Sequence, residues 1–285
     1  MSKRIRVALS GSGFRLGAHL GALQAIVDAG YEIVELAGTS GGAIVAAIFA
    51  GGMKLADMHE LCMRLDWSPM MRFSPWAVLR YQALCTGKEL EAFLGRGTNG
   101  WTFVDSPVDL KIIAADLLTE REFLFSRATT PTVPIAVAAR ASASIPIVFP
   151  PVACSGALLV DGGTCDNVPA SDLTVDEVPR VGIYLVSDDD ALRPGDYGLR
   201  TLAPRIIDLM LAANEAAHVE LDTSNGATIV RVPTGYASSF DRKMASAVRR
   251  RLYDDGYSAT KAAIVAMPVA QTAPITLPFD KATGL

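Results

Sequence analysis

Two short apolar runs, each followed by a glycine-rich turn and an apolar helical segment, constrain the fold of this chain more than any other feature. Residues 5–9 and 33–37 are rich in aliphatic and β-branched side chains, which is typical of buried strands. The first run leads to apolar residues at helical spacing, and the second leads to an apolar helix of small residues. Repeated strand, turn and helix units build a parallel sheet with helices on both faces. The sequence therefore predicts an α/β fold.

The rest of the chain is long and apolar enough to extend this sheet within a single domain. Half of the 285 residues are hydrophobic, and we expect residues 1–285 to share one core, built on a mostly parallel central sheet. Residues 53–82 are rich in methionine and aromatic side chains and break the alternation, so we expect an inserted helical cap there. Further strands are predicted near residues 110–115, 122–126, 157–160, 181–186 and 228–232, and long helices near 203–221 and 242–266.

The charge and the apolar pattern argue against two kinds of partner. The chain has 26 Lys and Arg residues against 30 Asp and Glu residues, and this net charge of −4 disfavours nucleic acid as a ligand. The most apolar run, residues 43–50, is far shorter than the ~20 residues that cross a bilayer, and the N-terminal residues lack the apolar stretch of a signal peptide. We therefore expect a cytoplasmic protein whose membrane contact is at most peripheral.

The cysteines and histidines show no metal-binding or disulfide pattern. The four cysteines lack C-x-x-C spacing and the density of a disulfide scaffold, and only three histidines accompany them. We therefore expect free thiols and no metal site. The cysteines are Cys62, Cys85, Cys154 and Cys165.

A candidate nucleophile lies in the turn Gly38-Thr39-Ser40-Gly41-Gly42. This turn joins a predicted strand to a predicted helix, which is the context that makes a G-x-S-x-G match informative. The flanking glycines have no Cβ to clash, so Ser40 can occupy a strained turn with its hydroxyl exposed near the positive end of the helix dipole. The alternative is a glycine-rich turn in which Ser40 only caps the helix.

A second glycine-rich turn, Gly11-Ser12-Gly13-Phe14-Arg15, follows the first predicted strand. Its backbone N–H groups are expected to point into the same crevice and to bind a developing oxyanion. Arg15 would add positive charge for the oxyanion or for a substrate phosphate, unless it is a surface arginine that opens the helix. The same glycines, with Glu32 or Glu35 about 20 residues further on, also match a dinucleotide-binding pattern, and this alternative stays open.

Ser40 needs a neighbouring base, and the sequence offers two arrangements. Asp161 ends a predicted apolar strand, and Gly162 and Gly163 after it allow the backbone to lie close to another element. A Ser40–Asp161 dyad is chemically sufficient if burial raises the pKa of the carboxyl group; otherwise Asp161 only caps a turn. The chain order also permits a triad of Ser40, Asp161 and His218, as in α/β-hydrolases.

Taken together, four motifs in this order resemble those of the patatin-like phospholipase family, lipid acyl hydrolases with a Ser-Asp dyad on an α/β sheet. The resemblance spans residues 5–190. The motifs are Gly11-Ser12-Gly13-Phe14-Arg15 with Gly17-Ala18-His19-Leu20-Gly21, then Gly38-Thr39-Ser40-Gly41-Gly42, then Ala141-Ser142-Ala143-Ser144-Ile145-Pro146 with Phe149-Pro150-Pro151, and finally Asp161-Gly162-Gly163 leading to Asn167-Val168-Pro169.

The resemblance implies a role for each of the candidate residues. Ser40 would be the nucleophile and Asp161 the base, and the N–H groups of the loop from Gly11 would form the oxyanion hole, with Arg15 as its cationic neighbour. The implied activity is hydrolysis of lipid acyl esters through an acyl-Ser40 intermediate, without a metal or an organic cofactor.

Ser12 and Leu16 depart from the family's pattern, which has glycine at both positions. The backbone N–H survives an exchange of glycine for serine, but a positive φ would strain Ser12. A protein whose oxyanion hole is spoiled would bind a lipid or a partner without hydrolysing it. A lipid-binding protein on the same scaffold is therefore the non-enzymatic alternative.

Two further groups of residues bear on lipid contact. The methionines and tryptophans of the cap either line an acyl-chain groove or interfacial lid, or pack in the core. The basic residues near the predicted C-terminal helix either touch anionic lipid heads or form a solvated helix face. The two groups are Met53, Met58, Met63, Met70, Met71, Trp67 and Trp76, and Arg242, Lys243, Arg249, Arg250 and Arg251.

Overall fold

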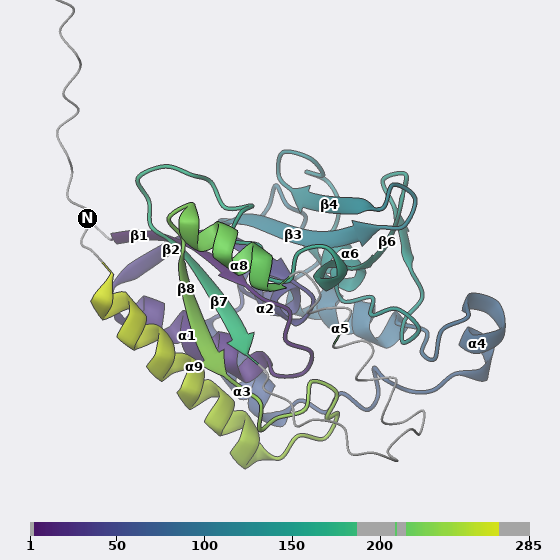
Figure 1. Ribbon diagram of the computed structural model, residues 1–285. Helices are drawn as coiled ribbons and strands as arrows, with labels where there is room; N and C mark the ends of the chain where they lie inside the picture. The colour runs from purple at the N-terminus through teal and green to yellow at the C-terminus, as the bar shows by residue number, and fades with distance from the viewer. Residues whose placement is uncertain (1–2, 187–208, 210–214, 268–285) are drawn as a thin grey trace, which may run out of the picture.

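Eight strands form one sheet in the computed structural model, which describes residues 3–186, 209 and 215–267 (Figure 1). The strands are β1 (Lys3–Leu9), β2 (Tyr31–Thr39), β3 (Asp109–Asp116), β4 (Arg121–Ser126), β5 (Val152–Cys154), β6 (Ala157–Asp161), β7 (Arg180–Val186) and β8 (Thr228–Pro233). The helices are α1 (Leu16–Asp28), α2 (Gly41–Ala50), α3 (Leu55–Arg64), α4 (Pro75–Tyr81), α5 (Lys88–Gly97), α6 (Ile135–Ser142), the short 3-10 helix η1 (Gly162–Thr164), α8 (Glu215–Ser224) and α9 (Ser246–Ala266).

The sheet is parallel through its centre and antiparallel at one side. Strands β3, β2, β1, β7 and β8 are neighbours in this order and run parallel. β4 and β6 pair antiparallel with β3, and β5 pairs antiparallel with β6. The predicted α/β fold is confirmed, and each predicted strand is found close to its expected ends. β5 was not predicted, because a strand of three residues carries too little pattern.

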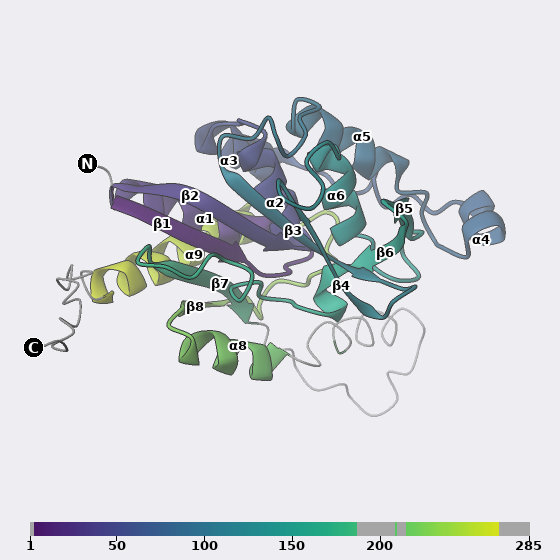
Figure 2. The same cartoon turned by 90° about the horizontal axis from the view of Figure 1, so that it is seen from above.

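The two faces of the sheet are packed differently. Val7, Leu36 and Ile112 point into the main core, to which α1, α2 and α9 also contribute. The alternate residues Ala8 and Ala37 belong to a smaller cluster on the other face, because successive side chains of a strand point to opposite sides. α8 lies across the sheet from α1 and α2 (Figure 2). Helices therefore cover both faces, as the strand and helix alternation predicted.

The segment expected to form a cap, residues 53–82, contains α3 and α4. α3 packs against α1 and α9, and Met58, Trp67 and Met70 are buried, so part of the segment belongs to the core. α9 matches the helix expected near residues 242–266, whereas much of the helix expected near 203–221 lies outside the described residues. None of the described helices is long and apolar enough to span a membrane.

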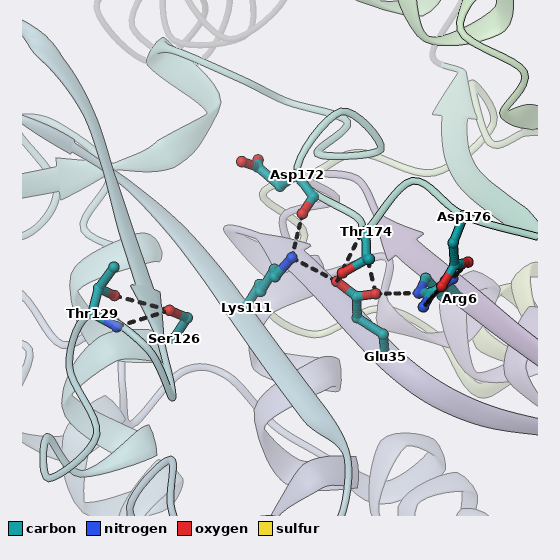
Figure 3. Close-up of polar contacts among 8 residues, drawn as sticks. All are labelled: Arg6, Glu35, Lys111, Ser126, Thr129, Asp172, Thr174 and Asp176. Carbon is teal, nitrogen blue, oxygen red and sulfur yellow. Dashed lines mark hydrogen bonds and ion pairs between the residues drawn. The ribbon is translucent and has the colours of Figure 1, made fainter. Parts of the chain in front are cut away.

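A buried network of charges joins three strands of the sheet to the loop before β7 (Figure 3). Glu35, only 2% exposed, lies 2.5 Å from Arg6 Nε and 2.6 Å from Lys111 Nζ. Its carboxylate also accepts hydrogen bonds from the N–H and hydroxyl groups of Thr174, and Asp176 pairs with the other end of Arg6. Glu35 is therefore committed to this network, and of the two acidic residues in the dinucleotide alternative only the exposed Glu32 remains a candidate for holding a ribose.

We expect Glu35→Ala to lower the free energy of unfolding by about 3–5 kcal/mol, because it leaves two largely buried cations without their partner. Glu60→Ala is the matched control: Glu60 pairs with Arg64 at 2.8 Å on an exposed helix surface, where about 0.5 kcal/mol or less is at stake. Urea unfolding of both variants measures the difference. Equal losses in the two variants would contradict the structural importance of the Glu35 network.

Candidate active site

Ser40 occupies a strained backbone conformation between β2 and α2. Its φ is 53° and its ψ is −120°, a combination that residues other than glycine rarely adopt. The neighbouring glycines make the turn possible, because a Cβ on Gly38 would lie 2.8 Å from the carbonyl oxygen of Gly42 and a Cβ on Gly42 would lie 2.3 Å from that of Leu9. The turn therefore has the tight geometry expected of a nucleophile turn.

The register of β3 brings Ser40 and Asp161 together. β2 runs parallel to β3 and pairs with it as far as Thr39, opposite Ile113. β6 runs antiparallel and takes over the pairing from Ala114, opposite Asp161. The two strands thus run toward each other along β3 and end at adjacent positions. Ser40 Oγ donates a hydrogen bond of 2.7 Å to Asp161 Oδ2.

The carboxylate of Asp161 is fully buried, and this environment shifts its protonation. Desolvation raises the pKa of Asp161 from its ordinary value of 3.8 to about 6, although hydrogen bonds from Ser40 and Gly163 oppose the shift. The Gly163 N–H donates to Oδ1 at 2.9 Å, which fixes the carboxylate with Oδ2 toward Ser40. Asp161 is therefore ionised at neutral pH but a stronger base than an exposed aspartate.

Two serines of the 141–146 motif hold the dyad in place, a role the sequence reasoning did not assign. The backbone N–H of Ser40 donates to Ser142 Oγ at 2.8 Å. The backbone N–H of Asp161 donates to the carbonyl oxygen of Ser144 at 3.0 Å. Both serines are fully buried at the end of α6. The only signal in the sequence was the motif itself, since nothing local links it to Ser40.

The glycine loop after β1 lies directly against the Ser40 turn. A Cβ on Gly41 would lie 2.2 Å from Ser12 Oγ and 2.6 Å from the carbonyl oxygen of Gly13, so the two turns touch at backbone distance. The Gly11 N–H donates to the backbone and side-chain oxygens of Asn167, at 3.0 and 3.1 Å. The sequence analysis placed Gly11 among the oxyanion donors, but in this structure its N–H is already bonded to Asn167.

The N–H groups of Ser12 and Gly13 are the loop donors that remain for a ligand. Within the described part of the chain, no hydrogen bond engages either of them, whereas Phe14 donates to Ser239 and Arg15 donates to Ser12. Gly13 carries the positive φ of the loop, at 54°, and Ser12 does not. The strain considered for Ser12 is therefore absent. Leu16, the other departure, is buried in the core at the start of α1.

Arg15 braces the loop from within and is not a surface side chain. It is 6% exposed, and its Nε donates to the carbonyl oxygen of Ser12 at 3.1 Å. Its Nη1 donates to Thr234 Oγ1 at 2.9 Å, just after β8. The guanidinium thereby links the loop to the end of β8, the edge strand of the sheet, and supplies positive charge close to the Ser12 backbone.

A group of carboxylates lies beyond the dyad, and His218 belongs to it. Oxygens of Glu122, Asp166 and Asp172 lie within 4.8 Å of one another, an arrangement that can hold a cation. His218 Nδ1 lies 3.3 Å from Asp166 Oδ1. The described contacts of Asp161 do not include His218, so the structure does not assemble the Ser40, Asp161 and His218 triad that the chain order permits.

The other two histidines have structural contacts. His19 is fully buried, and its Nε2 lies 2.8 Å from the carbonyl oxygen of Ser10. Burial lowers the pKa of His19 to about 3, so it stays neutral. His59 stacks on Tyr253 with the ring centroids 4.3 Å apart. Neither ring is positioned as the base for Ser40.

An apolar pocket opens beside Ser40. It is narrow: its cavity volume is about 20 Å³, and about 350 Å³ is empty when the space open to solvent is included. Carbon and sulfur atoms dominate its wall, and the buried part of the cap segment supplies one side of it. The lining residues are Gly13, Phe14, Ser40, Gly41, Ile44, Trp67, Met70, Met71, Leu90, Ala143, Ile145 and Phe149. Of the methionines and tryptophans for which a groove or core packing was expected, Trp67, Met70 and Met71 line this pocket, and Trp67 and Met70 are also buried.

The residues of this site lie in a part of the chain that matches a known protein family. A family model described as patatin-like phospholipase matches residues 7–174, which include the glycine loop, Ser40 and Asp161. The chain belongs to the patatin-like phospholipase family. The resemblance noted in the sequence is thus confirmed at the level of the family.

Individual relatives match part of the chain. The uncharacterized NTE family protein Rv1063c of Mycobacterium tuberculosis is 32% identical over 173 residues, which are 60% of this chain and 46% of that protein. The chain therefore spans about half the length of that relative. The uncharacterized protein R571 of Acanthamoeba polyphaga mimivirus is 28% identical over 228 residues, which are 75% of this chain and 77% of that protein.

Two solved structures share the fold of this patatin-like chain at low sequence identity. VipD from Legionella pneumophila superposes with a TM-score of 0.61 at 18% identity, over 93% of this chain and 67% of that one. The type III effector protein ExoU superposes with a TM-score of 0.55 at 15% identity, over 93% of this chain and 54% of that one. These likenesses confirm the architecture of a central sheet flanked by helices.

We expect Gly162→Ala to lower the free energy of unfolding by about 1–3 kcal/mol, because the new Cβ would lie 2.2 Å from the carbonyl oxygen of Ile113 and force the strands apart. Gly95→Ala is the matched control, since a Cβ there meets nothing within 4 Å and alanine favours the helix. Thermal and urea unfolding compare the two. A Gly162→Ala protein as stable as wild type would contradict the close contact of β3 with the residue after Asp161.

Proposed function

We propose that the protein is a serine hydrolase that cleaves acyl esters of lipids through an acyl-Ser40 intermediate. The observation that carries the proposal is the 2.7 Å hydrogen bond between Ser40 Oγ and the buried Asp161 carboxylate, beside an apolar pocket. A hydroxyl paired with a base of raised pKa, next to free backbone donors, is the arrangement that acyl transfer needs. Membership of the patatin-like phospholipase family supports a lipid as the substrate.

The first half of the proposed reaction forms the acyl-enzyme. Asp161 accepts the proton of Ser40 as Oγ attacks the ester carbonyl carbon, and the carbonyl oxygen becomes an oxyanion. The N–H groups of Ser12 and Gly13 stabilise this charge, with help from the positive end of α2. The protonated Asp161 then gives its proton to the departing alkoxide as the ester bond breaks. The alcohol leaves, and the acyl group stays on Ser40.

The second half reverses these proton transfers with water as the nucleophile. Asp161, again ionised, takes a proton from a water molecule that attacks the acyl-Ser40 carbonyl carbon. Collapse of the second tetrahedral intermediate releases the fatty acid, and the proton held by Asp161 returns to Ser40 Oγ. The protein thus ends the cycle in its starting state, and no metal or organic cofactor takes part in the steps proposed here.

A lipid-binding protein without hydrolysis is the second candidate, and the structure bears on it through Ser12 and Leu16. Ser12 keeps a negative φ and an unengaged N–H, and Leu16 fills the core without entering the pocket. Neither departure from the family's pattern thus removes a donor from the loop. These observations favour the hydrolase, and the binding protein remains an outcome of the first experiment below.

We expect Ser40→Ala to lower kcat/KM for a soluble chromogenic acyl ester by at least about 10³-fold, because among the described residues no other hydroxyl is hydrogen-bonded to the Asp161 carboxylate. Asp161→Asn removes the base and is expected to cost about 10²–10⁴-fold. His218→Ala is the control that separates the triad, and it should retain activity within a few fold. Unchanged turnover in either dyad variant, or a loss in His218→Ala as large as theirs, would contradict the proposed dyad. Mass spectrometry of products from a lipid extract then identifies the ester cleaved.

The pH dependence follows from the burial of Asp161. Only the ionised carboxylate can accept the Ser40 proton, and its pKa is raised to about 6. We therefore expect kcat/KM to fall about tenfold per pH unit below pH 6 and to level off above pH 7. The measurement is the pH profile of soluble ester hydrolysis, with unfolding monitored at each pH. A profile that stays flat down to pH 4.5 would mean that Asp161 keeps an ordinary pKa or is not the base.

A further inference from the structure

A strongly exposed apolar surface lies on α4 and on the neighbouring loop that contains Ile147. Leu79 is 83% exposed, Trp76 64% and Ile147 63%, which is unusual for side chains of this size. Figures 1 and 2 both show α4 projecting from the body of the molecule. We call this the α4 surface; its residues are Phe73, Trp76, Val78, Leu79, Tyr81, Leu84 and Ile147.

The α4 surface is a folded feature held by capping and backbone bonds. Ser74 caps α4 by accepting a hydrogen bond from the Ala77 N–H, and Ala77 is fully buried beneath the helix. The Ser74 N–H donates to the carbonyl oxygen of Leu84 at 2.9 Å, and the Leu84 N–H donates to that of Ile147 at 2.8 Å. The exposed side chains are therefore presented together on a fixed support.

The charge around the α4 surface differs from that of the whole chain. The chain has a net charge of −4, yet residues 72–84 contain Arg72 and Arg80 and no acidic residue. Both arginines are exposed, and neither forms an ion pair with any residue that the structure describes; Arg80 lies over the ring of Tyr81, 5.4 Å from its centroid. Arg242 joins them from the loop before α9, with its guanidinium on the carbonyl oxygen of Met71. Aromatic and aliphatic side chains beside unpaired arginines suit an anionic lipid surface.

The α4 surface adjoins the residues of the pocket beside Ser40 along the chain. Met71, which lines the pocket, is followed directly by Arg72 and Phe73. Ile147 lies between Ile145 and Phe149, which also line the pocket. A lipid layer that covers the α4 surface would therefore lie next to the segments that carry the pocket residues Met71, Ile145 and Phe149.

We propose that the α4 surface is the site at which the protein docks on anionic membranes, with Trp76, Leu79 and Ile147 entering the lipid interface and Arg72 and Arg80 contacting the head groups. The choice of a lipid layer as the partner rests on the proposed function, since the pocket that the surface adjoins would receive the acyl chain. Arg249 of α9 is not part of this site, because it is half-buried and its guanidinium bonds the carbonyl oxygens of Cys62 and Met63.

Flotation of the full chain with vesicles tests the proposal. The vesicles contain phosphatidylcholine alone or with 30 mol% phosphatidylglycerol, on the order of the anionic content that attracts basic segments. We expect binding to the anionic vesicles, a loss of affinity of at least about tenfold in Trp76→Ser/Leu79→Ser, and a smaller, salt-dependent loss in Arg72→Gln/Arg80→Gln. Ser40→Ala should bind like wild type, so the result does not depend on hydrolysis.

Matched variants away from α4 serve as controls. Leu117→Ser/Leu118→Ser removes two exposed leucines from the turn after β3, and Arg250→Gln/Lys261→Gln removes two exposed cations from α9. Both should bind within about twofold of wild type, and thermal unfolding verifies that all variants fold. Wild-type protein that ignores anionic vesicles, or α4 variants that bind as well as the controls, would overturn the proposal. So would a dimer, detected by sedimentation, that only the α4 variants lose, since a second copy would then cover this surface.

Discussion

The contact on which the site depends is the hydrogen bond between Ser40 and Asp161, and one edge of β3 creates it. Two strands of opposite direction share that edge, β2 up to Ile113 and β6 from Ala114. The ends of β2 and β6 therefore meet. Ser40, which follows β2, and Asp161, which ends β6, lie side by side as a result. Gly162 is then required, because its backbone lies against Ile113 where a side chain has no room.

The site is held together at the expense of stability. An ionised carboxylate is costly to bury, and among the described residues the Asp161 carboxylate accepts two hydrogen bonds and has no cation beside it in compensation. Since its folded pKa lies above that of an unfolded aspartate, Asp161 favours the folded state less as the pH rises from 4 to 6. Ser40 adds a backbone conformation that is itself strained. The Glu35 network and the buried glycine contacts belong to the same sheet and hold these groups in place.

Arginines have different roles in the interior of the molecule and on its surface. Buried arginines act as braces: Arg15 ties the glycine loop to Thr234, and Arg6 ties β1 to the loop before β7. Arg72 and Arg80, by contrast, form no ion pair with any described residue and are exposed beside apolar side chains. The same residue type therefore supports the proposed catalytic loop in one place and forms the proposed lipid contact in another.

The sequence by itself determined the α/β class, the described strands other than β5, and the tight turn at Ser40, because these depend on local pattern. It offered the pairing of Ser40 with Asp161 only through the resemblance to the family's motifs, beside a triad with His218. Only the tertiary structure decided that Gly11 is bonded to Asn167, that Ser142 and Ser144 hold the dyad, and that His218 joins Asp166. Each of these contacts joins residues that are distant along the chain. Their partners follow from strand register and helix packing, which no local pattern specifies.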